Sequence, residues 1–476
     1  VNNGIYYGYG SVETDSAQNS FTSSLFLQSK NGIVQFEPEW PYIEELEADI
    51  FLQNGQLDIN AKHAMIAGTP LDNLKAYLPE ADTGKANFLT LTADALLTKE
   101  LVDYWLLESP IATNTKMIMD QLTVNTAAHT SIKLEIPVTK PEGSDKTQDI
   151  EYLVNTTVIK GNILHRPSKL TFEDVTGMIS VDSKTGVSAK KIESKLFNEP
   201  TLLKIETSYY NTNHLTKLDS PSQLTKLSLS GKLAIASLFD YLETPKPGFL
   251  DGNFLYLAEL NLSSDEKKYP LLNVKTDLFG ASCLCPAPFS KNLHEKEDLN
   301  LSLLLKPDQS YLTATLNSKR IPSLKAELLY TDEKLSFGEL LIGGAKVKDT
   351  DIKGFNIAAN LKLANLETWI NFLTENIKQA QDTKTKLDES SYLKQIQLYI
   401  EDLDGFGHLF QKSHISIKPQ ENKWLFNIKG KDVTGKVLLS NNEEPLILDF
   451  EKLNLVSLDK ILEKPKVVGS DSEDSV

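Results

Sequence analysis

Apolar and polar residues alternate with a period of two along most of the chain, which is the pattern of half-buried β-strands. In one run, Leu227, Leu229, Leu233 and Ile235 alternate with polar residues, and similar runs cover residues 254–262, 299–305, 424–428 and 446–450. Turn-forming residues separate such runs, as at Asn54-Gly55, Lys184-Thr185-Gly186, Lys306-Pro307-Asp308 and Asn441-Asn442. Because helix-length segments between strands are scarce, we predict an all-β fold, a long antiparallel meander, rather than a parallel βαβ fold.

Three segments interrupt this alternation and predict short helices near 71–78, 93–108 and 365–380. The residues spaced for one helix face are Leu97, Leu101, Tyr104 and Trp105 in the second segment and Leu366, Trp369, Ile370, Leu373 and Ile377 in the third. Ser109-Pro110 ends the second helix. We interpret all three segments as plugs or caps packed on the sheet.

No shift in composition divides the chain, so we expect residues 1–468 to form one continuous, elongated segment. The polar insertions at 140–149 and 382–391 are expected to be exposed loops. Residues 469–476 are acidic and rich in serine, which is typical of a disordered tail.

The formal net charge of −16 argues against nucleic acid as a partner, because phosphates would be repelled. It also argues against broad electrostatic docking on anionic lipid headgroups, which requires clusters of Lys and Arg. No stretch reaches the roughly 20 apolar residues of a transmembrane helix, and no secretory signal opens the chain. Any membrane anchor is therefore expected to lie outside this chain.

The sequence offers no recognisable catalytic constellation. Its seven histidines lack metal-ligand spacing, and neither a phosphate-binding loop nor a nucleophile elbow occurs. Pairs of acidic residues arise by chance among 65 carboxylates and are interpreted as solvated surface. We predict that the chain is not an enzyme and binds no metal or cofactor. Cys283 and Cys285 are expected to be free or buried thiols in a turn beside Pro286 and Pro288, because a Cys-x-Cys disulfide closes a very small ring.

An open antiparallel sheet must cover its apolar face with a second sheet, by closure, or with a ligand. A sheet curled into an apolar trough could leave its interior for a lipid. The alternation alone does not separate this arrangement from a self-packed sandwich core.

A series of short motifs occurs along the chain in one particular order. They are EPEWP at 37–41, GQLDI at 55–59, DYWLLESPI at 103–111, LEIP at 134–137, DLFGA at 277–281, PAPFSK at 286–291 and LETW at 366–369. In these motifs and in their order, from about residue 37 to 455, the chain resembles AsmA-like proteins of the YhdP type. It departs from the family at Cys285, where Leu is usual, and in lacking the family's N-terminal membrane anchor and C-terminal part.

The resemblance implies a long sheet curled into an open hydrophobic groove, the AsmA-like β-groove. Such proteins are anchored in the inner membrane of Gram-negative bacteria, span the periplasm and carry phospholipid toward the outer membrane, supporting its barrier. The implied partners are phospholipid and, through segments outside this chain, the two membranes or their proteins; the chain itself is expected to be monomeric and periplasmic. Burying acyl chains is favourable by about 0.8 kcal/mol per CH₂ group, so transport of this kind needs no catalytic residue.

We expect the apolar face of the sheet to line the groove. The candidate lining residues are Leu229, Leu233, Ile235, Tyr256, Ala258, Leu260, Val274 and Leu278. The alternative is a structural or adhesive β-solenoid of the cell envelope, whose interior its own side chains fill. A carbohydrate-active solenoid enzyme would require clustered carboxylates and stacked aromatic residues on one face, and the sequence contains no such cluster.

Overall fold

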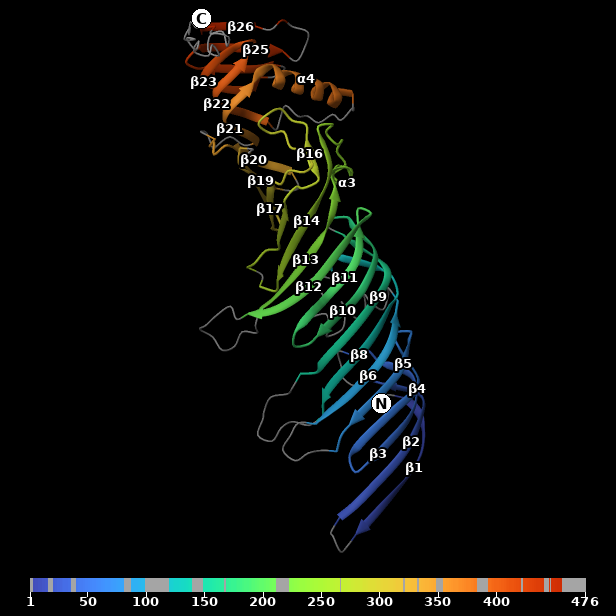
Figure 1. The fold of residues 1–476 in the computed structure, drawn as a ribbon. Helices are drawn as coiled ribbons and strands as arrows, with labels where there is room; N and C mark the ends of the chain where they lie inside the picture. The colour runs from blue at the N-terminus through green and yellow to red at the C-terminus, as the bar shows by residue number, and fades with distance from the viewer. Residues whose placement is uncertain are drawn as a thin grey trace, which may run out of the picture. The chain divides into compact units, whose positions relative to one another are not determined.

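The computed structural model describes residues 3–15, 20–35, 40–80, 87–98, 120–138, 149–166, 168–210, 222–265, 267–319, 322–331, 334–347, 354–382, 393–420, 423–440, 445 and 447–455. This part of the chain forms 26 β-strands of one open, mixed sheet and two helices, α3 and α4 (Figure 1). The predicted all-β class with a few short helices is confirmed. Two compact units share the chain: unit 1 comprises Val1–Gly231 with Glu259–Lys268, and unit 2 comprises Lys232–Ala258 with Tyr269–Val476.

In unit 1 the strands follow one another in an antiparallel meander, except that β6 pairs with β8 and β7 pairs with β9. The strands are β1 (Asn3–Asp15), β2 (Ser20–Val34), β3 (Ile43–Gln53), β4 (Gln56–Ile66), β5 (Thr69–Leu78), β6 (Phe88–Leu97), β7 (Leu122–Asn125), β8 (Ala128–Pro137), β9 (Glu151–His165), β10 (Leu170–Asp182), β11 (Gly186–Leu196), β12 (Glu199–Tyr210) and most of β13 (Ser222–Ala234).

Unit 2 contains α3, most of β14 and all elements after β14. They are α3 (Ile235–Tyr241), β14 (Leu250–Ser263), β15 (Leu271–Thr276), β16 (Ala281–Cys283), β17 (Asp298–Leu305), β18 (Gln309–Asn317), β19 (Leu324–Thr331), β20 (Lys334–Ile342), β21 (Gly354–Asn365), α4 (Leu366–Asp382), β22 (Leu393–Gly405), β23 (His408–Gln420), β24 (Lys423–Lys429), β25 (Val433–Ser440) and β26 (Ile447–Leu453).

The sheet is mostly antiparallel, as predicted, and the exception is β21, which pairs in parallel with both β20 and β22. Parallel neighbours require connections that return the chain to the same end of the sheet. The connection after β20 and the one that contains α4 serve this purpose. The sheet is therefore mixed. Because β21 and β22 run in the same direction, they need a long connection, and α4 forms part of it.

Two of the predicted helices are wrong where the structure describes them. Residues 71–78 belong to strand β5, in which Asn73 has a φ of 54° and the register with β6 shifts between Asp72 and Lys75. This bulge places Leu71 and Leu74 on the same buried face, so it imitates helical spacing. Residues 93–97 belong to strand β6, whereas 99–108 lie outside the described residues, as do the tail and most of both predicted loops.

The helix predicted near 365–380 is confirmed as α4. Helix α3 was not predicted, because the alternation of β13 continues through its first residue, Ile235. Ile235 is nevertheless buried. The periodic pattern therefore predicted correctly that its side chain lies in the interior, but it did not predict a helix.

The two faces of the unit 1 sheet differ sharply in polarity. Buried apolar side chains from β3 to β12, such as Leu134 and Ile192, form one continuous cluster on one face. The other face carries ion pairs, including Lys62 with Asp49 and Lys195 with Asp174, both at 2.8 Å. Register shifts in β2–β3, β3–β4, β5–β6 and β9–β10 mark β-bulges, which bend the strands, and the strands curve visibly in Figure 1.

Candidate functional site

The strand register of unit 2 aligns apolar side chains in rows that run from strand to strand, which we call lanes. In each lane, consecutive members are direct cross-strand partners, so their side chains point to the same face. The middle lane consists of Val274, Leu301, Ala314, Ala326, Leu340, Ile357, Ile396, Ile417, Phe426, Val437 and Leu448. It crosses every strand from β15 to β26 except β16, without a polar residue.

One further lane lies on each side of the middle lane, two residues away along each strand except in β22, where a register shift makes the separation from the first lane three residues. The first lane consists of Leu272, Leu303, Leu312, Leu328, Gly338, Phe355 and Leu393. The third lane consists of Thr276, Leu299, Leu316, Leu324, Ile342, Ala359, Leu398, Ile415, Ile428, Gly435 and Phe450. One face of the unit 2 sheet thus carries three lanes, which are apolar except for Thr276 at the start of the third.

The intervening residues put mainly polar groups on the opposite face. Asn300 pairs with Thr315, and Thr315 pairs with Lys325. The ammonium group of Lys325 forms an ion pair with Glu327, which lies opposite Glu339. Burial and the nearby Glu327 carboxylate raise the pKa of Glu339. One apolar row, Leu271, Leu304, Tyr311, Leu329 and Phe337, crosses this face at the strand ends.

The middle lane is not buried. From Val274 to Val437, each of its side chains is partly exposed, in contrast to the fully buried cluster of unit 1. Among the described residues of unit 2, the largest cluster of fully buried apolar side chains lies beside the third lane, around Ala359 and Leu361. Because a self-filled core buries its lining, partial exposure along a continuous apolar row indicates a face that is accessible from outside.

Helix α4 and one loop cover a part of the third lane. Leu366 and Trp369 of α4, together with Phe289 from the β16–β17 loop, pack against Ala359 and its neighbours. Rings of Phe289 and Trp369 lie 5.9 Å apart in an edge arrangement. The expectation that this helix packs on the sheet is confirmed for Leu366 and Trp369.

A model of the family described as YhdP protein matches residues 15–474. The chain belongs to the YhdP family. No curated protein and no solved structure matches it. Family membership supports an envelope-related role connected with lipid transport. Both described helices fall short of the length and apolar character that crossing a membrane requires.

The YhdP-type motif DLFGA, at 277–281, connects β15 to β16 and is hydrogen-bonded to the β16–β17 loop that carries Phe289. Asp277 forms an ion pair with Lys296 at 2.8 Å, and this hydrogen-bonded pair lowers the pKa of Asp277. Gly280 has a φ of 93°, and a Cβ atom there would lie 2.4 Å from the Asn253 carbonyl oxygen, so only glycine fits. The buried Lys291 donates hydrogen bonds of 2.7 Å to the carbonyl oxygens of residues 278 and 281. The motif therefore orders the loop over the third lane.

The same loop corrects the expectation for its two cysteines. Cys283 and Cys285 form a disulfide, so the prediction of free thiols is wrong. Their Cα atoms lie 5.3 Å apart, which is within the usual range for a disulfide, because the chain turns sharply at Leu284. The thiols were expected in a turn, whereas Cys283 ends strand β16 and Cys285 directly precedes the turn at 286–289.

The residues predicted to line the YhdP groove do not all occupy equivalent places. Val274 lies in the middle lane. In unit 1, Leu229 continues a lane of cross-strand partners that consists of Leu97, Ala128, Val158, Gly177, Ile192 and Leu203. Leu260 follows Glu259, whose ion pair with Lys226 marks the polar face, so Leu260 points to the apolar one.

The other candidates are more dispersed. Leu233 lies near the end of β13, and Tyr256 and the buried Ala258 lie in β14. Ile235 begins α3, and Leu278 occupies the loop after β15 with a φ of 49°, so neither lies in a strand. Sequence reasoning missed most of the middle lane. Its signal was present in the run 299–305, where Leu301 is flanked by Asn300 and Ser302.

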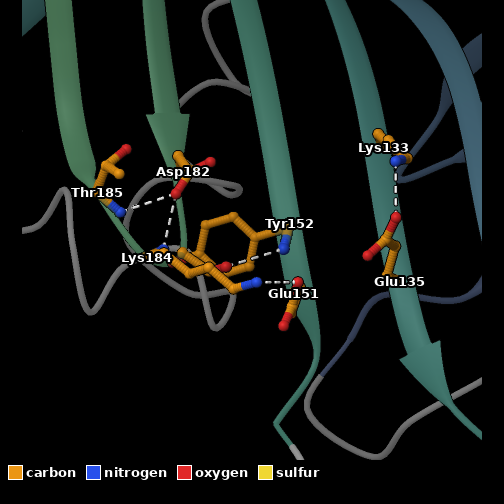
Figure 2. A network of polar contacts seen from close by, with 8 residues as sticks. Lys133, Glu135, Glu151, Tyr152, Asp182, Lys184 and Thr185 are labelled. Carbon is orange, nitrogen blue, oxygen red and sulfur yellow. Dashed lines mark hydrogen bonds and ion pairs between the residues drawn. The ribbon is translucent and has the colours of Figure 1, made fainter. Parts of the chain in front are cut away.

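On the polar face of unit 1, local polar contacts hold the ends of neighbouring strands together (Figure 2). Lys184, in the β10–β11 turn, forms an ion pair with Glu151 of β9 at 2.6 Å. The Asp182 carboxylate accepts hydrogen bonds of 2.8 Å from the backbone N–H groups of Lys184 and Thr185. These contacts fix the turn, and no reactive group is among them.

We expect Asp182→Ala to destabilise unit 1 by about 1 kcal/mol, because two turn N–H groups lose their acceptor. Glu151→Gln serves as the control, since it removes only the exposed ion pair with Lys184 and its smaller effect should shrink further as salt is added. Urea unfolding at low and high salt measures both. Equal, salt-dependent losses in the two variants would contradict the assigned role of Asp182.

Proposed function

We propose that this chain is a non-enzymatic part of a lipid-transport bridge, whose apolar face shields phospholipid acyl chains between the inner and outer membranes of a Gram-negative envelope. In this function it supports the barrier of the outer membrane. The observation that carries the proposal is the partly exposed middle lane, an unbroken apolar row bordered by two further lanes. Family membership supports the same class of role.

The lanes have suitable dimensions for hydrocarbon. Neighbouring strands lie about 4.8 Å apart, so ten steps from β15 to β26 give a contour of roughly 50 Å. One leaflet of a bilayer core is about 15 Å thick, so the lane is longer than a single acyl chain. An acyl chain that moves along it exchanges one apolar contact for another, at almost constant free energy. Aliphatic side chains without polar partners favour such movement.

The proposed partners follow from this arrangement. Phospholipid is the cargo, with headgroups remaining in water beside the open face, and no cofactor or nucleic acid takes part. We propose a periplasmic location, with tethering to the inner membrane and contact with both membranes through segments outside this chain. The chain is proposed to act as a monomer.

Site-specific photo-crosslinking tests the proposal directly. A photoreactive amino acid replaces Leu301 or Ala326 on the apolar face, and Asn300 or Lys325 on the opposite face serves as the matched control on the same strands. We expect phospholipid adducts, identified by mass spectrometry from Gram-negative cells, at the first pair only. Equal adducts on both faces, or none at all, would contradict the proposal.

A self-filled structural scaffold is the second candidate, and the fully buried apolar cluster of unit 1 favours it. A scaffold of this kind would hold no lipid. Organic extraction of the purified, folded chain separates the two functions. Absence of phospholipid in the extract, with an intact fold by circular dichroism, would favour the scaffold.

A further inference from the structure

Helix α4 is fixed firmly at its N-terminal end. The Asn365 side chain accepts a hydrogen bond of 2.9 Å from the N–H of Thr368 and donates one of 2.9 Å to Asp404 of β22. Glu367 accepts a hydrogen bond of 2.5 Å from the N–H of Phe406, in the turn between β22 and β23. These contacts attach the first turn of α4 to one strand pair and would serve as a hinge.

Four aromatic side chains connect the next part of the helix to a different part of unit 2. The ring of Phe372 lies 5.1 Å from that of Phe249, which precedes β14, and 5.7 Å from that of Trp369. Trp369 in turn contacts Phe289 of the β16–β17 loop. Figure 1 shows α4 extending from β21 and β22 toward β16 and α3. We call Phe249, Phe289, Trp369 and Phe372 the latch.

Beneath the latch, the third lane and the middle lane differ in how accessible their side chains are. Beneath it, Ala359 of the third lane is buried and Leu398 packs in the same cluster. Their neighbours in the middle lane, Ile357 and Ile396, remain partly exposed. The third lane is thus closed over β21 and β22, at a place where the middle lane is open.

In the closed position, α4 has apolar side chains that are exposed and polar groups that are buried. Ile370 and Leu373, predicted to pack on the sheet, are 44% and 51% exposed instead. The indole N–H of Trp369 and one carboxylate oxygen of Glu367 are buried without a hydrogen-bond partner among the described residues. A buried polar group without a partner is unfavourable, so these two groups reduce the free-energy difference between the closed and the open position of α4.

We propose that α4 is a lid over the third lane, hinged at Asn365–Glu367 and held closed by the latch. It must open before an acyl chain can occupy the lane beneath. When the lid opens, the aromatic contacts of the latch are lost. Water then reaches Trp369, and lipid contacts Ala359 and Leu398. This inference rests on the proposed function, because it assumes that acyl chains travel along the lanes.

A reversible lock tests the lid. Phe249→Cys and Phe372→Cys are introduced in the full chain together with Cys283→Ser and Cys285→Ser, and a short, cleavable thiol cross-linker joins the two new cysteines. A diazirine amino acid at Leu398 reports lipid in the third lane, and one at Ala326 reports the middle lane. Vesicles of phosphatidylethanolamine and phosphatidylglycerol supply the lipid. The control carries Phe372→Cys alone, which the reagent cannot lock.

We expect locking to lower lipid capture at Leu398 at least tenfold, and cleavage of the cross-linker to restore it, with little change at Ala326. Capture at Leu398 that is the same in the locked and cleaved states would overturn the lid, whereas capture at Ala326 would still support the groove. Absence of capture at Ala326 in every state would instead overturn the proposed function, and the lid with it.

Discussion

Replacing Leu301 by Asp is expected to lower the phospholipid that copurifies with the chain at least tenfold. Leu301 lies in the middle lane, between Val274 and Ala314. A carboxylate there would have to lose water whenever hydrocarbon passed, at a cost of several kcal/mol, and each 1.4 kcal/mol is worth about a factor of ten. Because Leu301 is only partly buried, the sheet itself should tolerate the charge. Quantitative mass spectrometry of extracted lipid measures the effect.

Asn300→Asp provides the matched control, since it adds the same charge one residue away on the opposite face. It should leave lipid content and the outer-membrane barrier unchanged. The uncharged variant Ala326→Trp should also reduce lipid, because the indole fills the lane. If Leu301→Asp folds normally by circular dichroism and still sustains the barrier in cells, the lane does not carry lipid.

Replacing Leu134 by Ala is expected to cost about 2–5 kcal/mol of unfolding free energy. Leu134 is 1% exposed and pairs with Leu91 on one side and Tyr152 on the other, so its truncation leaves a cavity inside the apolar cluster of unit 1. The urea midpoint should fall accordingly, with little change in the slope of the transition.

Leu96→Ala tests whether burial is the cause. Leu96 lies in the neighbouring strand β6, but its side chain is 47% exposed on the other face. Its loss should change the free energy of unfolding by about 0.5 kcal/mol or less. Similar losses in the two variants would mean that the two faces of unit 1 do not differ in packing.

Period-two alternation was sufficient to predict strands wherever they are regular. Runs such as 299–305 and 424–428 became β17 and β24 as expected. The prediction failed where the backbone departs from a regular strand: a bulge at Asn73 imitated a helix, and the chain left β13 for α3 at Ile235. Alternation also carries no information on strand direction, so the parallel pairing of β21 was missed.

For the candidate site, the sequence predicted an apolar face but not its lanes. Alternation within a strand identifies the side to which Leu229 or Val274 points. Which residues of neighbouring strands lie opposite depends on turn length and on bulges, and neither is encoded in the strand itself. Family resemblance predicted the groove as a whole, whereas the loop that orders Phe289 required the positions of Gly280 and Lys291.

The meander has a consequence for how such a sheet changes in evolution. Each lane continues because every strand matches its immediate neighbours, and no member depends on a strand far away. Insertion of one two-stranded hairpin, with the same alternation, would add about 10 Å of lane and leave all existing pairs in register. The number of strands would thus set the distance that the sheet bridges, and this distance would change in steps of one hairpin. The strands between β16 and β22 are the exception, since a hairpin inserted among them would separate α4 from Phe249, from Phe289 or from the residues it covers.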